Sequence, residues 1–216
     1  MIEQLADGLL AWPARHPEWH PGKWGAEVVS FAVAEPGRTL LIDPLVPDGV
    51  WEDLDRVVAG SVEIAITIPY HVRSAEQASS RYGDAPIWGH PACAKRLDDR
   101  SQFRELSPGN APPGLSAYAI GKPRRHETPL RIASQRALVF GDAVVGTDDG
   151  LRVWEQELGR NARRERWYRE RFLPTLEPLA LLDIDKVLVT HGPSVLTGGR
   201  RALRAAFDAP PWHHRG

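Results

Sequence analysis

Three apolar runs of the chain each lead to a side chain that can bind a metal ion. VEIAIT leads to His71, ALVFGD ends at Asp142, and KVLVTH ends at His191. Each run is short, apolar and rich in Val or Ile, as in a buried strand. Because ligands of open α/β sheets bind at the carboxyl ends of the strands, we expect these three side chains to meet at one sheet edge.

Imidazole nitrogens and carboxylate oxygens are typical ligands of Zn²⁺ and similar divalent ions, and a site with an open position can also hold water. His126, which precedes another apolar run, is a candidate fourth ligand. Each residue also has a structural interpretation. Asp142 suits a turn or a helix cap, His191 stands before a Gly-Pro pair and can shape a turn, and His126 suits the surface.

These runs belong to an alternation of strands and helices that predicts an α/β fold. Strands are expected at 27–34, 39–44, 62–67, 86–90, 115–120, 127–133, 137–145 and 185–192. Helices are expected at 49–60, 74–83, 91–99, 159–182 with breaks at two prolines, and 198–209. The three consecutive strands in the middle indicate a second sheet with antiparallel parts. No linker or repeat divides the chain, so residues 1–216 are interpreted as one domain.

Composition narrows the classes of partner. The net charge of −1 provides no general attraction for nucleic acid or an anionic membrane, and the Arg-rich run at 163–171 is interrupted by two glutamates. Cys93 is the only cysteine, so any metal must be held by histidines and carboxylates. No apolar run could span a bilayer and the start lacks a secretory signal, so a cytoplasmic location is expected. The eight Trp residues are compatible with a dimer.

Three motifs, LLIDP, GDAVVG and VLVTHGPSV in this order, resemble the metallo-β-lactamase-fold superfamily. The resemblance covers about residues 25–208 and implies a four-layer αββα sandwich with its site at the sheet edge. GLLAWPARHPEW near the start resembles the N-terminal segment of a small, poorly characterised branch. The resemblance implies that Asp43 supports the site from behind, that Asp142 contacts or bridges the metals, and that His191 is the last His ligand.

The superfamily carries H-x-H-x-D-H after a strand, and this chain departs from that motif at residues 67–74. If His71 is the second His, Pro69 occupies the first His position, Arg73 the Asp position and Ser74 the last His position. A register shifted by one residue leaves no ligand at all. The first register is preferred because it keeps one ligand and leaves Ser74 as N-cap of the next helix, with Gln77 completing a capping box.

The third His of the superfamily is matched to His126, sixteen positions before Asp142. A gapless match would instead place Pro123 near that position. Glu127, beside His126, could act as an acid or base if it faced the pocket, but a Glu at the start of a strand is usually solvated, and this is expected here.

Arg73 would stand where the superfamily holds a second ion, and it stays protonated at any relevant pH. Two unit charges about 4 Å apart interact by roughly 4 kcal/mol at an effective dielectric near 20, and a dication doubles this. A second metal is therefore disfavoured. The first hypothesis is a mononuclear hydrolase of a small ester, thioester or phosphoester. One Zn, Fe or Mn ion would be held by His71, Asp142, His191 and His126, and Arg73 would bind an anionic group of the substrate.

The alternative hypothesis is a metal-free, non-catalytic protein. In that case Arg73 replaces the charge of the ion and pairs with Asp142, and the pocket binds a small anion or the surface binds a protein partner. Both hypotheses place Arg73 near Asp142. They differ in metal content and in turnover.

Overall fold

The computed structural model describes residues 1–17, 19, 25–121, 126–155 and 161–212. Its strands form a seven-stranded sheet, a four-stranded sheet in the order β13-β10-β9-β8, and a two-stranded hairpin of β11 and β12. None of the helices in the described part of the chain is long and apolar enough to cross a membrane.

The strands of the first sheet follow one another in chain order. Strands β1 to β4 pair antiparallel, whereas β4 to β7 pair parallel. The strand bounds are β1 Glu3–Ala6, β2 Leu9–Arg15, β3 Glu27–Glu35, β4 Arg38–Ile42, β5 Ser61–Ile66, β6 Ile87–Gly89 and β7 Phe103–Glu105. The helices among them are α1 Asp48–Val57, η1 Pro69–His71, α2 Ala75–Arg81 and η2 Cys93–Arg96, where η1 and η2 are 3₁₀ turns.

The second half of the chain builds the second sheet and its helices. The strand bounds are β8 Leu115–Ala117, β9 Leu130–Ile132, β10 Ala137–Phe140, β11 Val144–Thr147, β12 Gly150–Val153 and β13 Lys186–Val189. The helices are α3 Ala162–Trp167, the π-helical η3 Tyr168–Phe172, α4 Leu173–Leu176, the 3₁₀ turn η4 Glu177–Leu181 and α5 Gly199–Asp208. Strands β10 and β13 are parallel, so their carboxyl ends lie at the same edge.

Alternate side chains of the central strands point to opposite faces of each sheet, which produces three apolar layers. In β4, Leu40 and Ile42 pack between the two sheets, while Leu41 packs with the residues of α1 and α2. In β10, Val139 packs between the sheets and Phe140 packs with the residues of α3 to α5. Because both faces are covered, these strands are continuous apolar runs.

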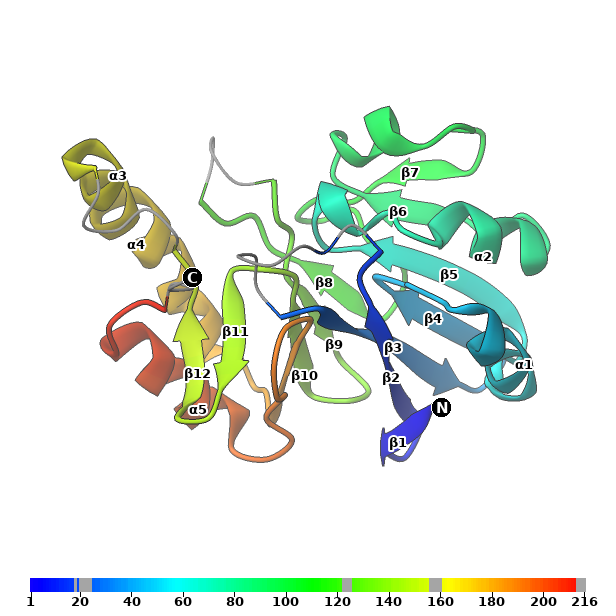
Figure 1. Ribbon diagram of the computed structural model, residues 1–216, viewed down its shortest axis with the longest axis horizontal. Helices are drawn as coiled ribbons and strands as arrows, with labels where there is room; N and C mark the ends of the chain where they lie inside the picture. The colour runs from blue at the N-terminus through cyan, green and yellow to red at the C-terminus, as the bar shows by residue number, and fades with distance from the viewer. Residues whose placement is uncertain (18, 20–24, 122–125, 156–160, 213–216) are drawn as a thin grey trace.

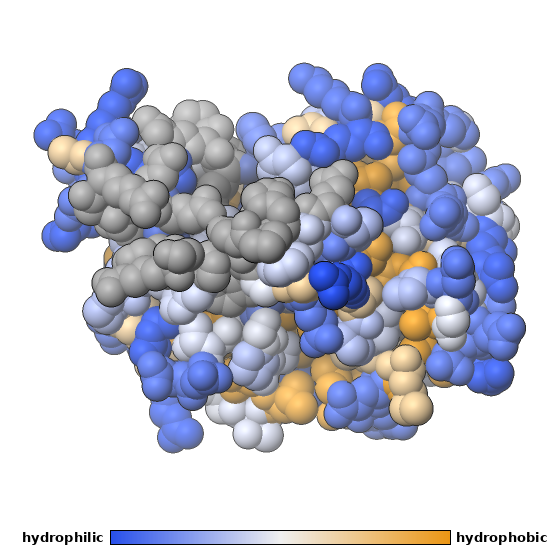
Figure 2. All heavy atoms as spheres, in the orientation of Figure 1, coloured by the Kyte–Doolittle hydropathy of each residue, from blue (hydrophilic) through white to orange (hydrophobic). Residues whose placement is uncertain are grey.

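Figure 1 shows α1 and α2 on one side of the molecule and α3 to α5 on the other, with the sheets between them. The order of layers is therefore helix, sheet, sheet, helix, and the predicted four-layer αββα architecture is confirmed. In the space-filling view, hydrophilic residues cover the outer margins of the molecule and hydrophobic residues show only in patches between them (Figure 2).

The N-terminal residues form strands that the sequence did not predict. Strand β1 pairs with β2 only as far as Ala11, so Pro13 lies on a part of β2 that is paired on one side alone, to β3. That position tolerates proline, which has no amide hydrogen to donate. Trp12 is fully buried in the core, and its indole nitrogen donates to the Leu45 carbonyl at 2.8 Å.

Two helical predictions were wrong. The segment 91–99 forms only the short turn η2, because the chain is extended at Leu97, whose side chain is buried in the core. Ser74 does precede α2, but its side chain caps no helix amide. Its hydroxyl instead accepts the Val46 amide at 3.0 Å and ties the loop after β4 to the start of α2.

The prolines predicted to break the segment 159–182 begin new turns. Pro174 lies in the first turn of α4 and Pro178 in the first turn of η4. Proline is tolerated there because the first amides of a helix have no partner within it.

The predicted strand 137–145 is divided in two. Strand β10 ends at Phe140 and β11 begins at Val144, with Asp142 in the connection. The backbone amides of Gly141 to Ala143 donate to the side chain of Glu127 and not to a neighbouring strand. This interruption places Asp142 at the end of β10.

Candidate metal centre

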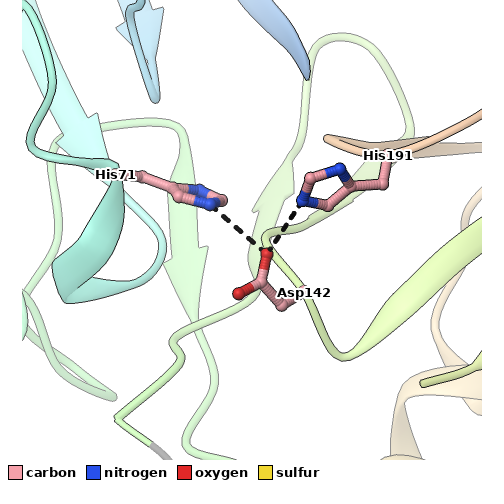
Figure 3. A group of neighbouring side chains, drawn as sticks. All are labelled: His71, Asp142 and His191. Carbon is pink, nitrogen blue, oxygen red and sulfur yellow. Dashed lines mark ion pairs between the residues drawn. The ribbon is translucent and has the colours of Figure 1, made fainter. Parts of the chain in front are cut away.

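The two sheets bring the carboxyl ends of their strands together at the candidate site. Asp43 follows β4 and His71 lies in η1 after β5, whereas Asp142 follows β10 and His191 follows β13. The sequence reasoning about strand ends therefore leads to one place in the structure. His71, Asp142 and His191 point toward one another, with the Asp142 carboxylate between the two imidazoles (Figure 3).

One oxygen of Asp142 is the centre of this cluster. Asp142 Oδ1 lies 3.3 Å from His71 Nε2 and 3.4 Å from His191 Nε2, and the three ligand atoms all lie within 4.8 Å of one another. Oδ1 is buried and makes no hydrogen bond within the described part of the chain. A tetrahedral Zn²⁺ site with bonds of about 2.0–2.1 Å has ligand atoms about 3.3–3.4 Å apart. The two distances from Asp142 Oδ1 to the imidazole nitrogens, and the orphaned oxygen itself, therefore fit a divalent ion.

Asp43 holds His71 from behind. Its Oδ2 lies 2.9 Å from His71 Nδ1 and also accepts the Thr67 hydroxyl, while its Oδ1 accepts the Thr67 amide at 2.8 Å. With the Nδ1 hydrogen directed at a carboxylate, His71 presents Nε2 to the cluster, which is the arrangement that orients a metal-binding imidazole. Asp43 is buried and has a φ of 48°, a backbone conformation that Asp tolerates better than most residues.

Arg73 lies beside this pair and does not point into the pocket. Its Nη1 donates to the Asp43 carbonyl at 3.2 Å, and its Nε and Nη2 are buried and without hydrogen-bond partners in the described part of the chain. None of the ion pairs found among the described residues joins Arg73 to Asp142. Arg73 has a φ of 43°, a strained conformation for a bulky side chain. Its charge therefore acts on the site through space.

Burial and the neighbouring charges shift the pKa values of His71, Asp142 and Arg73. Burial and the nearby Arg73 charge oppose protonation of His71, but Asp43 and Asp142 outweigh them, and the pKa of His71 is raised. Burial also opposes ionisation of Asp142, but the two imidazoles outweigh it and lower the pKa of Asp142 well below its usual value. Burial lowers the pKa of Arg73. The cluster is thus built to hold a positive charge between Asp43 and Asp142.

Glu127 positions the loop that carries Asp142. Its Oε1 accepts the amides of Gly141, Asp142 and Ala143 at 3.0, 3.2 and 3.1 Å. The prediction that Glu127 is solvated was wrong, because its side chain is buried beneath this loop. A larger residue is disfavoured at Gly141, since a Cβ would lie 2.6 Å from Thr67 Oγ1 and 3.1 Å from Ile68 Cγ2. No spacing rule indicates a contact of this kind from the sequence.

The His191 segment is fixed by backbone contacts with β3 and β11. The Val29 amide donates to the Thr190 carbonyl, and the Gly146 amide donates to the His191 carbonyl, both at 2.9 Å. A Cβ on Gly146 would lie 2.1 Å from the Pro193 carbonyl oxygen, so the chains approach too closely for any other residue. This packing orients His191 toward Asp142.

His126 is not a member of the cluster of potential ligands found among the described residues. Its exposed ring lies against His90, with 4.7 Å between the ring centroids. Pro123, the alternative match to the third His, lies outside the described residues.

A pocket of about 870 Å³ opens over Asp142. Its wall includes Tyr70 of η1, two basic residues of η2, His126 and a basic residue of α3. The polar side chains that line it are Tyr70, Lys95, Arg96, His126, Asp142 and Arg164. Arg73, predicted to face the substrate, does not line this pocket, because it is packed behind Asp43.

Solved structures resemble the chain over nearly its whole length. A metallo-β-lactamase from Erythrobacter litoralis, with β-mercaptoethanol in its active site, matches at a TM-score of 0.62 and 15% identity and covers 96% of this chain and 94% of its own. A metallo-β-lactamase from Pontibacter korlensis matches at 0.63 and 13% identity, covering 97% and 99%. The chain has the metallo-β-lactamase fold.

The fold alone does not decide the function. The chemotaxis sensor ODP, whose structure contains a peroxy diiron species, matches this metallo-β-lactamase-fold chain at a TM-score of 0.63 and 12% identity, covering 99% and 96%. No family model and no curated protein sequence matches the chain. Function must therefore be argued from the site.

Proposed function

We propose that this metallo-β-lactamase-fold protein is a mononuclear, metal-dependent hydrolase of a small ester, thioester or phosphoester. The supporting observation is the buried Asp142 Oδ1, without a hydrogen bond in the described part of the chain, at 3.3 and 3.4 Å from two imidazole nitrogens. His71, Asp142 and His191 would hold the ion, which can be zinc, iron or manganese. When bound, such an ion supplies Lewis acidity and lowers the pKa of water to about 7.

The side chains of the site have separate roles in this proposal. Asp43 keeps the hydrogen of His71 on Nδ1, so that Nε2 is available as a ligand atom. The second oxygen of Asp142 points away from the imidazoles (Figure 3), and Asp142 lines the pocket, so this oxygen can accept a hydrogen bond from the attacking water and orient it. Arg73 adds a fixed positive charge behind Asp43, and this charge acts on the site through space. This charge supports the choice of one ion over two.

Hydrolysis assays with and without metal test the proposal. The purified chain would be stripped with a chelator, reloaded with Zn²⁺, Fe²⁺ or Mn²⁺, and assayed on 4-nitrophenyl esters, a thioester and bis(4-nitrophenyl) phosphate. We expect turnover that depends on the added ion and is lost in Asp142→Ala. Asp53→Asn, a change of an Asp on α1 that pairs only with Arg56 in the described contacts, is the matched control and should retain full activity. Absence of turnover on every substrate with every ion would contradict the proposal.

A second candidate is a metal-free protein that binds a small anion. The observation in its favour is the pairing of Asp142 with two imidazoles, together with the raised pKa of His71. If His71 is protonated, it and Arg73 balance the charges of Asp43 and Asp142 without a metal. Metal content and turnover distinguish this candidate from the first.

A further inference from the structure

The pocket over Asp142 has an excess of positive charge on the wall next to η1. Lys95 and Arg96, the last two residues of η2, are exposed and line the pocket. No ion pair found among the described residues involves either of them. Arg164 also lines the pocket, but its guanidinium makes two 2.9 Å hydrogen bonds to the buried carboxylate of Glu155. The charge of Arg164 is therefore compensated, and those of Lys95 and Arg96 are not.

The negative charge at the base of the pocket does not compensate this wall. Asp142 is the only carboxylate among the described residues that line the pocket, and its Oδ1 faces the imidazoles of His71 and His191. A ligand in the pocket therefore meets a positive potential, which favours anions.

Local contacts hold the two basic residues in place. The turn that leads to them is fixed by His90, whose Nδ1 accepts the Ala92 amide at 3.1 Å and whose carbonyl accepts the Cys93 amide at 2.7 Å. The Arg96 guanidinium carbon lies 4.3 Å from the centroid of the Tyr70 ring. A guanidinium that rests on an aromatic face keeps its in-plane N–H groups available for a ligand.

This wall lies next to the proposed reaction centre. Tyr70 and His71 are adjacent residues of η1, so the side chain that supports Arg96 comes from the same turn as the candidate metal ligand. Arg73 donates to the Asp43 carbonyl behind the site and does not line the pocket. The residues available to recognise a charged group are thus those of η2.

We propose that Lys95 and Arg96 bind a carboxylate or phosphate group of the substrate, so that the pocket selects small esters or thioesters that carry a second, anionic group away from the bond that is cleaved. The part of this inference that concerns ester cleavage rests on the proposed function. Binding of the anion itself does not require turnover and can be measured separately.

The test uses the full-length chain, the double variant Lys95→Gln/Arg96→Gln, and Arg56→Gln as a matched control. Arg56 is an exposed basic residue in the last turn of α1, and its side chain pairs with Asp53. Binding of inorganic phosphate and of succinate is measured by calorimetry at low and high salt. In parallel, hydrolysis of mono-4-nitrophenyl succinate is compared with that of the neutral 4-nitrophenyl butyrate, and the metal content of each variant is recorded.

We expect the double variant to bind anions about tenfold more weakly, which corresponds to about 1.4 kcal/mol. Its KM for the succinate ester should rise by a similar factor with little change in kcat, while its kinetics on the neutral ester, its metal content and its Tm stay unchanged. Preferential loss of phosphate or of succinate binding identifies which anion the wall recognises. Arg56→Gln should behave as the unaltered protein in every assay.

The two proposals fail in different ways. If no ester is hydrolysed but anion binding is lost in the double variant, the hydrolase proposal is wrong and the anion site stands. Suppose instead that both esters are hydrolysed, that the KM of the double variant for the succinate ester equals that of the unaltered protein, and that its phosphate and succinate affinities are also unchanged. The anion site is then wrong and the hydrolase proposal stands.

Discussion

At the scale of single residues, the site depends on the carboxylates of Asp43 and Asp142, which lie on the two sides of the His71 imidazole. His71 is held between Asp43 Oδ2 at 2.9 Å and Asp142 Oδ1 at 3.3 Å. Such a position is favourable for a protonated imidazole and equally for a metal ion next to a neutral one. The chemistry of the site therefore depends on whether a metal ion displaces the proton of His71.

The replacement Asp43→Asn tests how much the site depends on orientation of His71. Asn tolerates the left-handed backbone of residue 43 and keeps one acceptor oxygen, but it removes the negative charge opposite Nδ1. Loss of a partner behind a metal-binding His weakens metal affinity by about 10–100-fold. We expect a loss of this size in a zinc titration, and no loss in Asp53→Asn. Equal zinc affinities in the two variants would show that Asp43 plays no part in orienting the ligand.

The pKa shifts predict how the stability of the metal-free chain depends on pH. The raised pKa of His71 stabilises the fold fully below the usual imidazole value of about 6.5, and this contribution is lost as the pH rises through the folded-state pKa. The lowered pKa of Asp142 stabilises the fold above the usual carboxyl value of about 3.9, and this contribution is lost as the pH falls through the folded-state pKa. The metal-free chain should therefore show its highest Tm between these limits.

Added zinc should change the alkaline side of this profile. Zinc binds the unprotonated imidazole, so its stabilising effect grows as the pH rises through the pKa of His71. Tm measured against pH with a chelator and with excess zinc should diverge above neutral pH. His71→Gln should remove both the alkaline loss in the chelated chain and the gain with zinc. Parallel profiles for the unaltered chain with and without zinc would mean that the ion does not bind at His71.

At the scale of elements, the interruption between β10 and β11 is the feature that creates the site. The sequence predicts an uninterrupted apolar strand over 137–145. The strand is interrupted because three backbone amides donate to the Glu127 side chain and not to a neighbouring strand. Because Glu127 and Asp142 are distant in sequence and belong to no recognised spacing, this contact could not be predicted. The ends of β5 and β13 were predictable because their apolar runs end at polar residues.

Glu127→Ala should release the loop that carries Asp142. Each buried amide left without a partner costs about 1–3 kcal/mol, so for the three amides we expect a loss of at least about 3 kcal/mol in the free energy of unfolding, together with weaker zinc binding. Glu127→Gln keeps the acceptor oxygen and is the matched control, with a much smaller loss. Chemical denaturation and zinc titration measure both effects. If the Ala and Gln variants were equally stable, the hydrogen bonds from the loop would not be what holds it.

At the scale of the whole molecule, the two sheets position the site by packing against each other. The alternation of buried strands and helices predicted an α/β fold with a second sheet, and the resemblance to the metallo-β-lactamase-fold superfamily implied the αββα order of the layers. The N-terminal strands could not be predicted, because Pro13 lies within the apolar run LLAWPAR of β2 and a proline argues against a strand. The substitutions at the H-x-H-x-D-H motif were visible in the sequence, but the direction of the Arg73 side chain, which donates to the Asp43 carbonyl, was not.

A pair of leucines tests the contribution of the layer between the sheets. Leu188 is fully buried in that layer, whereas Leu181 is 67% exposed. Leu188→Ala should lower the free energy of unfolding by about 2–5 kcal/mol. Leu181→Ala should change it by less than about 0.5 kcal/mol. A similar effect of both changes in urea denaturation would contradict the layer arrangement.

The most direct test of the central claim, that His71, Asp142 and His191 hold a single ion, is the metal content of the chain purified without a His tag and incubated with zinc. Asp142→Ala, His191→Ala and His126→Ala would be prepared identically. We predict one zinc per chain in the unaltered protein and in His126→Ala, and none in the other two variants. No zinc in any of the four proteins, or two zinc ions per chain in the unaltered protein, would contradict the account.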